Sequence, residues 1–282
     1  MGPKPRRVAR ALRQEKGTLR RKYATAAKQA PGHLFQNWEV IQRRLRAASR
    51  LALFLDFDGT LAPLRSHPED VRFPPATRQA LRRLAWHPRV RAFIISGRRM
   101  PDVRRHVGLP RVTCLGLHGW ETRRRRPESV GLHRFMERLR REVESKFAGA
   151  EGVWVEDKYV GFVVHSRYAP QHERKAARAA LDKSLAPVAS RVRVLKGKNV
   201  WEVLPVEVRG KGAAVKRILE GLGPGVLPLY VGDDLSDEAA FEALPRGVTV
   251  RVGRRGKTSA RYWLRDPEEV REFLERLEEE IS

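Results

Sequence analysis

The sequence LALFLDFDGT at residues 51–60 decides the fold. Its apolar run at 51–55 leads directly into Asp56 and Asp58, and Gly59 follows. A short apolar run bounded by glycine is typical of a strand that is buried on both faces in a parallel sheet. The pattern therefore predicts a buried parallel strand with two carboxylates at its C-terminal end.

Helix-like and strand-like segments alternate on both sides of this strand. The longer segments carry apolar residues at helical spacing, and the shorter ones are continuous apolar runs. Such alternation predicts an α/β fold, a doubly wound parallel sheet of the Rossmann type with helices on both faces. Further strands are expected at 90–95, 112–117, 228–231 and 249–252, and helices at 34–45, 74–84, 101–107, 212–222, 238–244 and 268–281.

The middle of the chain follows another pattern, in which two helix-like segments alternate with two strand pairs. This composition predicts an α+β module inserted into the α/β body. The helices are expected at 132–147 and 171–185, and the strand pairs at 153–155 with 159–167 and at 191–195 with 199–204. The expected parts are a basic flexible arm at 1–32, a core at 33–120 and 208–282, and the inserted module at 121–207.

The charge of the chain is strongly positive and unevenly placed. There are 58 Lys and Arg against 33 Asp and Glu, a formal net charge of +25. Residues 1–50 hold 14 of the basic residues against only Glu15 and Glu39. Such a block can bind nucleic acid or an anionic membrane, or it can be a solvated basic tail that reflects an arginine-rich proteome. We favour the solvated tail and expect no nucleic-acid partner.

Several classes of protein are excluded by composition. With 41% hydrophobic residues, the chain has enough apolar material for a core, so wholesale disorder is excluded. No stretch approaches the roughly 18–20 apolar residues of a membrane span. The single cysteine, Cys114, cannot form an internal disulfide, and residues 1–30 lack the apolar segment of a secretory signal. We therefore expect a cytoplasmic protein.

Polar residues follow several of the expected strands. In open α/β sheets, ligands bind beyond the carboxyl ends of the strands. Clustered carboxylates repel one another unless a cation neutralises them, and oxygen ligands without clustered His or Cys favour Mg²⁺. A lysine and a serine hydroxyl beside that ion suit a phosphate group. The residues expected to converge are Asp56, Asp58, Ser96, Lys211, Asp233 and Asp234.

The spacing of Asp56 and Asp58 adds a reaction to this site. Where the chain turns out of the sheet, alternate residues can both reach one centre. One carboxylate can attack phosphorus and form an acyl phosphate, and the other can protonate the leaving oxygen and later deprotonate water. Gly59 permits the sharp exit, and Thr60 offers a hydroxyl and a backbone N–H to phosphate. The pattern predicts hydrolysis of a phosphate ester.

Four motifs together resemble those of the haloacid dehalogenase superfamily of phosphatases: DFDGTLAPL at 56–64, SGR at 96–98, Lys211, and VGDDLSDEAAF at 231–241. The resemblance implies a fold in which an α+β cap is inserted into the doubly wound core and closes over the substrate. It implies that Asp56 is the nucleophile and Asp58 the general acid and base.

The same resemblance assigns the remaining residues of these motifs. Ser96 and Lys211 would bind phosphate, Thr60 would join the catalytic set, and Gly97 and Arg98 would contact substrate. The cofactor Mg²⁺ would be held by Asp56, the carbonyl of Asp58 and Asp233, with Asp234 at the metal and Asp237 supporting these ligands from behind.

Three segments resemble trehalose-6-phosphate phosphatases: GLHGWE at 116–121, VEDKYVGFVVHSR at 155–167 and KNVWEVLPVEVRGKGAAV at 198–215. The resemblance implies that Glu156, Lys158, Arg167 and Glu202 contact the sugar from the cap. A disaccharide presents many hydroxyls, and charged side chains hydrogen-bond them strongly.

The sequence leaves the roles of four further side chains in these segments open. His118 could touch substrate or bridge core and cap, and His165 is expected to be structural. Trp120 and Trp154 could stack on sugar, but large apolar residues more often pack in a core.

Other functions stay open at this point. A phosphatase of sucrose, glucosylglycerol or mannosylglycerate phosphate would carry the same motifs. A protein of another class would bind nucleic acid or membrane through its basic arm and keep a vestigial phosphatase fold. The arm could instead dock a trehalose-phosphate synthase that supplies the sugar phosphate.

Overall fold

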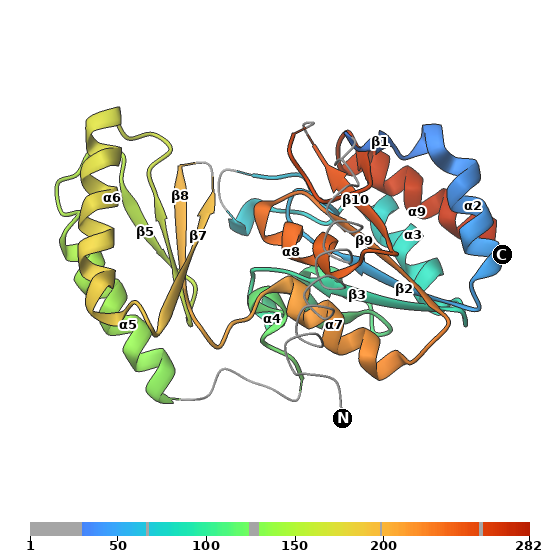
Figure 1. Cartoon of the computed structure of the whole chain (residues 1–282), viewed down its shortest axis with the longest axis horizontal. Coiled ribbons are helices and arrows are strands. Elements are labelled where there is room, and N and C mark those ends of the chain that lie inside the picture. The colour runs from blue at the N-terminus through green and yellow to red at the C-terminus, as the bar shows by residue number, and fades with distance from the viewer. Residues whose placement is uncertain (1–29, 66–67, 124–129, 198, 254–255) are drawn as a thin grey trace, which may run out of the picture.

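The computed structural model describes residues 30–65, 68–123, 130–197, 199–253 and 256–282 of the chain (Figure 1). Most of the expected basic arm therefore lies outside the described residues. Within them, no helix combines the length and apolar content that crossing a membrane requires.

A seven-stranded sheet forms the centre of the larger part of the molecule. All its strands run parallel, in the order β1-β11-β10-β9-β2-β3-β4. Chain order reverses beside β2: β3 and β4 follow it on one side, and β9, β10 and β11 lie on the other side with β1 at the far edge. The strands are β1 (Gly32–His33), β2 (Arg50–Leu55), β3 (Val90–Ile95), β4 (Thr113–Leu115), β9 (Val226–Gly232), β10 (Val248–Val252) and β11 (Tyr262–Leu264).

Helices cover both faces of this sheet, which confirms the expected doubly wound α/β fold. Short 3-10 turns η1 (Phe35–Asn37), η2 (Pro68–Asp70) and η3 (Leu117–Gly119) connect the elements. One face carries α2 (Trp38–Ala47), α3 (Pro75–Trp86), α4 (Met100–Val107) and α9 (Pro267–Ile281), and the other carries α7 (Lys211–Leu222) and α8 (Leu235–Ala243).

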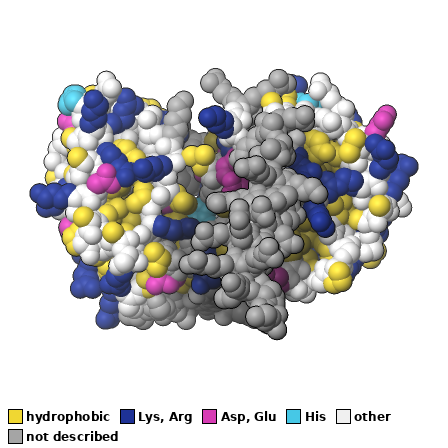
Figure 2. All heavy atoms as spheres, viewed as in Figure 1, with side chains coloured by type: hydrophobic (Ala, Val, Ile, Leu, Met, Phe, Trp, Pro, Cys, Tyr) yellow, Lys and Arg dark blue, Asp and Glu magenta, His cyan; other side chains and the backbone are white. Residues whose placement is uncertain are grey.

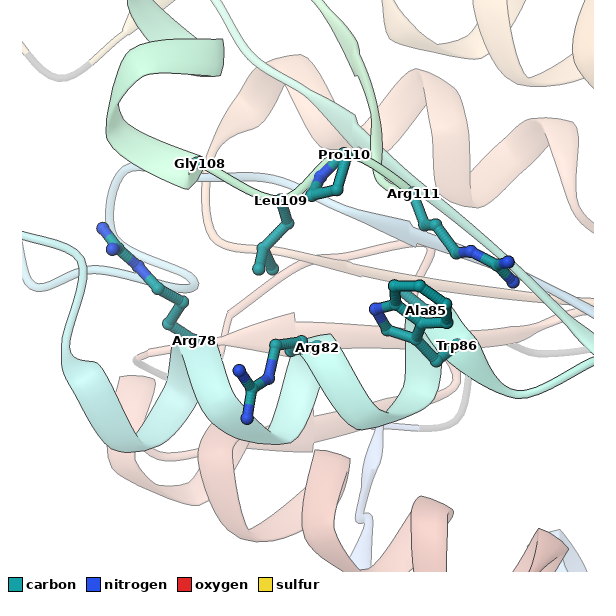
Figure 3. A pocket seen from close by; sticks show the side chains of 8 residues that line it. All are labelled: Arg78, Arg82, Ala85, Trp86, Gly108, Leu109, Pro110 and Arg111. Atoms are coloured by element: carbon teal, nitrogen blue, oxygen red, sulfur yellow. The ribbon is translucent and has the colours of Figure 1, made fainter.

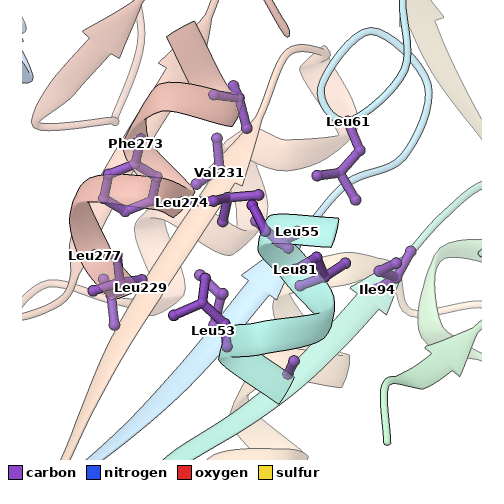
Figure 4. Close-up of a cluster of buried hydrophobic side chains, with 14 of the residues drawn as sticks. Leu53, Leu55, Leu61, Leu81, Ile94, Leu229, Val231, Phe273, Leu274 and Leu277 are labelled. Carbon is purple, nitrogen blue, oxygen red and sulfur yellow. The ribbon is translucent and has the colours of Figure 1, made fainter. Parts of the chain in front are cut away.

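The strand β2 is buried on both faces, as its apolar run predicts. Leu53 and Leu55 lie in the cluster that contains Leu81 of α3 and Leu274 of α9 (Figure 4). Phe54, which points the other way, packs in the cluster on the opposite face. Alternate residues of a strand face opposite sides, so continuous apolar sequence is what a doubly covered strand needs.

A second, four-stranded antiparallel sheet lies beside the core, and we call it, with its helices, the cap module (residues 130–205). Its order is β5-β6-β8-β7. In Figure 1 its helices lie on the outer face of the sheet, and the other face is turned toward the core. The elements are α5 (Val130–Ser145), β5 (Trp154–Asp157), β6 (Phe162–His165), α6 (Gln171–Leu185), the 3-10 turn η4 (Ala186–Val188), β7 (Val192–Gly197) and β8 (Val200–Pro205).

The structure corrects three details of the sequence-based expectations. Gly32 pairs with Tyr262 in the sheet, so a flexible arm cannot extend to residue 32. The strand β11 was not expected, because a three-residue strand is too short for a periodic signal. The strand expected at 112–117 ends at Leu115, since Leu117 and His118 have positive φ angles of 49° and 56° and turn the chain.

Candidate active site

The carboxyl ends of β2, β3 and β9 bring the predicted residues together. The backbone N–H of Asp56 donates to the Val231 carbonyl at 2.9 Å, and that of Ser96 donates to the Leu115 carbonyl at 3.1 Å. These bonds continue the ladder one step beyond the strands. The site therefore lies at the point where the strand order reverses, which is the usual ligand position in open α/β sheets.

Three carboxylates meet at this point. Oxygens of Asp56, Asp233 and Asp237 lie within 4.8 Å of one another, and Asp56 and Asp237 are buried. Burial raises the pKa of Asp56 well above its usual range, and Asp237 and Asp233 raise it further, against the opposing effect of Lys211. Burial and then Asp237 raise the pKa of Asp233 to about 7. The cluster has more carboxyl groups than Lys211 can pair with, so a further cation would stabilise their ionised forms.

The buried Lys211 is the cation of this cluster. Its Nζ lies 2.9 Å from Asp56 Oδ1 and 2.8 Å from Asp237 Oδ1. Burial alone would lower the pKa of Lys211, but Asp237 and Asp56 outweigh it and raise the pKa above its usual value. The Tyr230 hydroxyl donates to the same Asp237 oxygen at 2.7 Å. Lys211 is therefore held charged and aimed at Asp56.

Two glycines make room for the carboxylates. A Cβ added to Gly59, whose φ is +81°, would lie 2.3 Å from Asp233 Oδ2. A Cβ on Gly232 would lie 2.3 Å from the carboxyl carbon of Asp237. Any side chain at either position would displace an acid of the cluster.

Asp58 lies beside the cluster and accepts two hydrogen bonds from Arg98. Arg98 donates to both Asp58 oxygens at 2.7 Å and to Asp102 at 3.0 Å. Burial would lower the pKa of Arg98, but its bonds to Asp58 raise it overall. Such a bidentate pair fixes carboxylate geometry. We expected Arg98 to contact substrate; the geometry favours a role in orienting Asp58.

The other predicted phosphate ligands are buried close by. The Ser96 hydroxyl accepts from the Arg98 backbone N–H at 3.1 Å. The Thr60 hydroxyl donates to Asp233 at 3.2 Å, and its backbone N–H to the Phe57 carbonyl at 3.4 Å. A Cβ added to Gly97 would lie 3.1 Å from the His118 ring, so Gly97 lets that ring approach.

The geometry separates the roles of Asp234 and Asp237. Asp234 caps the N-terminus of α8 and accepts from the Leu235 N–H at 2.6 Å, so its side chain is not in the acid cluster. Asp237 completes a capping box by accepting from the Asp234 N–H at 2.9 Å. The sequence DLSD at 234–237 has the three-residue spacing of such a box, so it also predicts that Asp234 and Asp237 cap a helix.

Glu202 brings the cap module into the site. Its carboxylate accepts from His118 Nε2 at 2.8 Å, so His118 bridges core and cap in this structure. Burial would raise the pKa of Glu202, but His118 and then Lys158 and Lys211 lower it overall. The backbone N–H of His118 donates to the Ser96 carbonyl at 2.9 Å, so His118 links Glu202 to the strand-end residue Ser96.

The remaining sugar residues of the prediction separate into two groups. Glu156 accepts from His165 Nε2 at 3.0 Å and also pairs with Lys158. Burial would raise the pKa of Glu156, but His165 and Lys158 lower it. Arg167 is exposed and makes no hydrogen bond or ion pair with another described residue. The structure thus brings together Glu156 and Lys158, and leaves Arg167 outside that group.

A separate cavity of about 550 Å³ lies on the core between α3 and the segment that follows α4 (Figure 3). Arg78, Arg82 and Trp86 line it from α3, and the guanidinium of Arg111 lies 3.9 Å from the Trp86 ring. None of the predicted site residues lines this cavity, so it is separate from the candidate active site.

Comparisons with known proteins identify the family of the chain. The family model described as trehalose-phosphatase matches residues 54–266. A trehalose-phosphate phosphatase of Mycobacterium tuberculosis (strain H37Rv) is 31% identical over 250 residues, which cover 83% of this chain and 63% of that protein. The probable trehalose-phosphate phosphatase D of Arabidopsis thaliana is 30% identical over 254 residues, 82% of this chain and 68% of that protein.

The solved structures support the fold. The C-terminal domain of Candida albicans trehalose-6-phosphate phosphatase has a TM-score of 0.76 at 24% identity, covering 90% of this chain and all of that domain. An Aspergillus fumigatus trehalose-6-phosphate phosphatase structure has a TM-score of 0.64 at 25% identity, covering 89% of this chain and 99% of that one. The chain spans 63% of the length of its mycobacterial relatives.

Proposed function

We propose, because this chain belongs to the trehalose-phosphatase family, that it hydrolyses trehalose 6-phosphate to trehalose and inorganic phosphate. The observation that carries the proposal is the position of His118, which joins the core to the cap module. Its backbone N–H donates to the carbonyl of Ser96 at 2.9 Å, and its Nε2 bonds the Glu202 carboxylate at 2.8 Å. A residue predicted to bind phosphate and a residue predicted to bind sugar are thus joined through one histidine.

The donor set fits Mg²⁺. Its three carboxylates are clustered and largely buried, and no described His or Cys joins them. We assign the ion to Asp56, the Asp58 carbonyl and Asp233. Asp237 supports them from behind, because its oxygens already accept from Lys211, Tyr230 and the Asp234 N–H. When bound, Mg²⁺ would offset the carboxylate charge and polarise the phosphate oxygens.

The reaction proposed for these residues has two steps. Asp56 attacks phosphorus, the bond from phosphorus to the sugar oxygen breaks, and Asp58 gives its proton to that oxygen. Asp58 then takes a proton from water, which attacks the phosphorus of the aspartyl phosphate and releases phosphate and Asp56. The two bonds from Arg98 fix the orientation of the Asp58 carboxyl group, which is the group that transfers a proton in both steps.

A substrate panel tests this function and its metal together. Purified protein should release phosphate from trehalose 6-phosphate faster than from sucrose, glucosylglycerol or mannosylglycerate phosphate. EDTA should lower the rate at least about a hundredfold, and added Mg²⁺ should restore it, because the buried acids need a cation. A tenfold preference for sucrose phosphate would show that trehalose 6-phosphate is not the substrate. Full activity in EDTA would show that the reaction does not need Mg²⁺.

The cap side chains should determine which sugar is accepted. We expect Glu156→Ala and Lys158→Ala each to lower kcat/KM for trehalose 6-phosphate about tenfold or more, because a charged hydrogen bond to a hydroxyl is lost. Hydrolysis of a small aryl phosphate, which has no sugar, should change little. Asp182→Ala, an exposed residue of α6 paired with Arg178, is the matched control on the same module. Equal losses on both substrates would show that these residues do not bind sugar.

The proposal extends to the cellular location of the protein and to the enzyme that supplies its substrate. We assign a cytoplasmic location, which the single buried Cys114 favours. A trehalose-phosphate synthase is the expected supplier of substrate, and the part of the arm that would dock it lies outside the described residues. Figure 2 shows Lys and Arg side chains on the described surfaces of both core and cap.

A further inference from the structure

The cap module carries a tryptophan whose position its own packing does not explain. Trp154 is 48% exposed, and it lies outside the buried clusters of the module. Its ring stacks on the His165 imidazole, with centroids 3.8 Å apart and planes 8° from parallel. An aromatic ring that is fixed by stacking and is half exposed can bind a ligand through its exposed surface.

The strand register places this ring on the face of the cap sheet that is turned toward the core (Figure 1). Trp154 lies opposite His165, and Glu156 lies opposite Val163, which in turn lies opposite Glu202. Residues that lie opposite each other in an antiparallel pair share a face, and so do residues two apart on one strand. Trp154 therefore shares its face with Glu202, whose carboxylate bonds His118 of the core.

The same register places Trp154 away from Lys211, the residue predicted to bind phosphate. On β7, Arg193 lies opposite Leu204, and its Nη2 would be 3.1 Å from a Cβ on Gly210, the residue before Lys211. From Leu204, β8 runs back through Glu202 to Val200, and Val200 lies opposite His165. Each step of two residues covers about 7 Å. The stacked rings of Trp154 and His165 thus lie one two-residue step beyond Glu156 and Glu202, the carboxylates that the proposed function assigns to the sugar.

Hydrogen bonds tie the ring pair to those carboxylates. His165, which supports the Trp154 ring, also donates to Glu156 at 3.0 Å, and Glu156 pairs with Lys158. A pyranose ring has an apolar face of C–H groups and a rim of hydroxyls. A flat indole beside a carboxylate and an ammonium matches both features.

We propose that Trp154, supported by His165, forms a stacking subsite for the sugar ring that does not carry the phosphate. The inference rests on the proposed function, since it needs a substrate long enough to reach past Glu156. A monosaccharide phosphate would be bound beside Glu156 and Glu202, and its single ring would not reach the Trp154 indole. The subsite would therefore separate disaccharide phosphates from monosaccharide phosphates.

Substitution of Trp154 tests the subsite. Trp154→Ala should lower kcat/KM for trehalose 6-phosphate about tenfold through KM, because stacking contributes on the order of one tenfold step in affinity. The values for glucose 6-phosphate and for a small aryl phosphate should stay within about twofold of wild type. Trp154→Phe should recover most of the loss. Trp86→Ala removes another tryptophan, 56% exposed on α3, and should change none of the three values.

The outcomes separate this inference from the proposed function. A wild-type protein inactive on trehalose 6-phosphate contradicts the proposed function, and Trp154→Ala is then measured on the preferred substrate of the panel. If that substrate has one sugar ring, the subsite is overturned. It is also overturned if Trp154→Ala loses activity equally on trehalose 6-phosphate and the aryl phosphate, or on neither. An unchanged Tm shows that the variant is folded.

Discussion

Replacement of Asp56 by asparagine is expected to lower kcat for trehalose 6-phosphate at least about a thousandfold, because the amide cannot attack phosphorus. The amide has nearly the shape of the carboxylate, and its oxygen can still accept from Lys211, which keeps its second partner Asp237. Burial and neighbouring acids already disfavour the charge on Asp56, so the neutral amide should not destabilise the fold.

Phosphate release and thermal unfolding of the purified variant together check this expectation. Asp70→Asn, which changes an exposed carboxylate of the core, is the matched control and should keep full activity. A variant that keeps a tenth of the wild-type rate with a normal Tm would show that Asp56 is not the nucleophile. A variant that loses both activity and Tm would instead show that Asp56 supports the fold.

The main elements and the meeting of the acids could be predicted because local sequence determines them. The apolar run at 51–55 can only be buried on both faces, and the acids directly after it must then lie at a sheet edge. The same holds for Asp233, which follows β9. Parallel strands bring their carboxyl ends to one edge, so convergence follows from topology without knowledge of any side-chain contact.

Side-chain pairing could not be predicted in the same way. Arg98 could point at substrate or at Asp58, and only the packed structure shows the grip on both Asp58 oxygens. The choice between Asp234 and Asp237 depends on where α8 begins, and helix ends are poorly specified by periodicity. The bond between His118 and Glu202 joins a turn of the core to the cap sheet, and the two residues are 84 apart in the sequence, a separation over which local pattern carries no information.

Replacement of Lys211 by methionine is expected to remove both activity and much of the stability. The kcat should fall at least about a hundredfold, since the cation that faces Asp56 is lost. Breaking a buried ion pair by removing one partner costs about 3–5 kcal/mol of unfolding free energy, because the other charge stays buried and unpaired. In this site two partners are left, Asp56 and Asp237. Denaturant unfolding and phosphate release measure the two effects.

The stability loss in Lys211→Met should depend on pH. Without Lys211, only burial and the neighbouring acids act on Asp56, and both raise its pKa above the value in the unfolded chain. A raised carboxyl pKa in the folded state gives stability that is present at low pH and lost as pH rises through that pKa. The variant should therefore approach wild-type stability near about pH 5 and fall further behind near about pH 8.

Two further variants decide whether the cluster causes the loss. Lys216→Met changes an exposed lysine of the same helix and should alter neither activity nor stability. Adding Asp237→Asn to Lys211→Met removes one unpaired carboxylate, so the double variant should be more stable than Lys211→Met alone and still inactive. If Asp237→Asn instead lowers stability by the same amount in both backgrounds, Lys211 and Asp237 are not coupled, and the ion pair does not hold the site together.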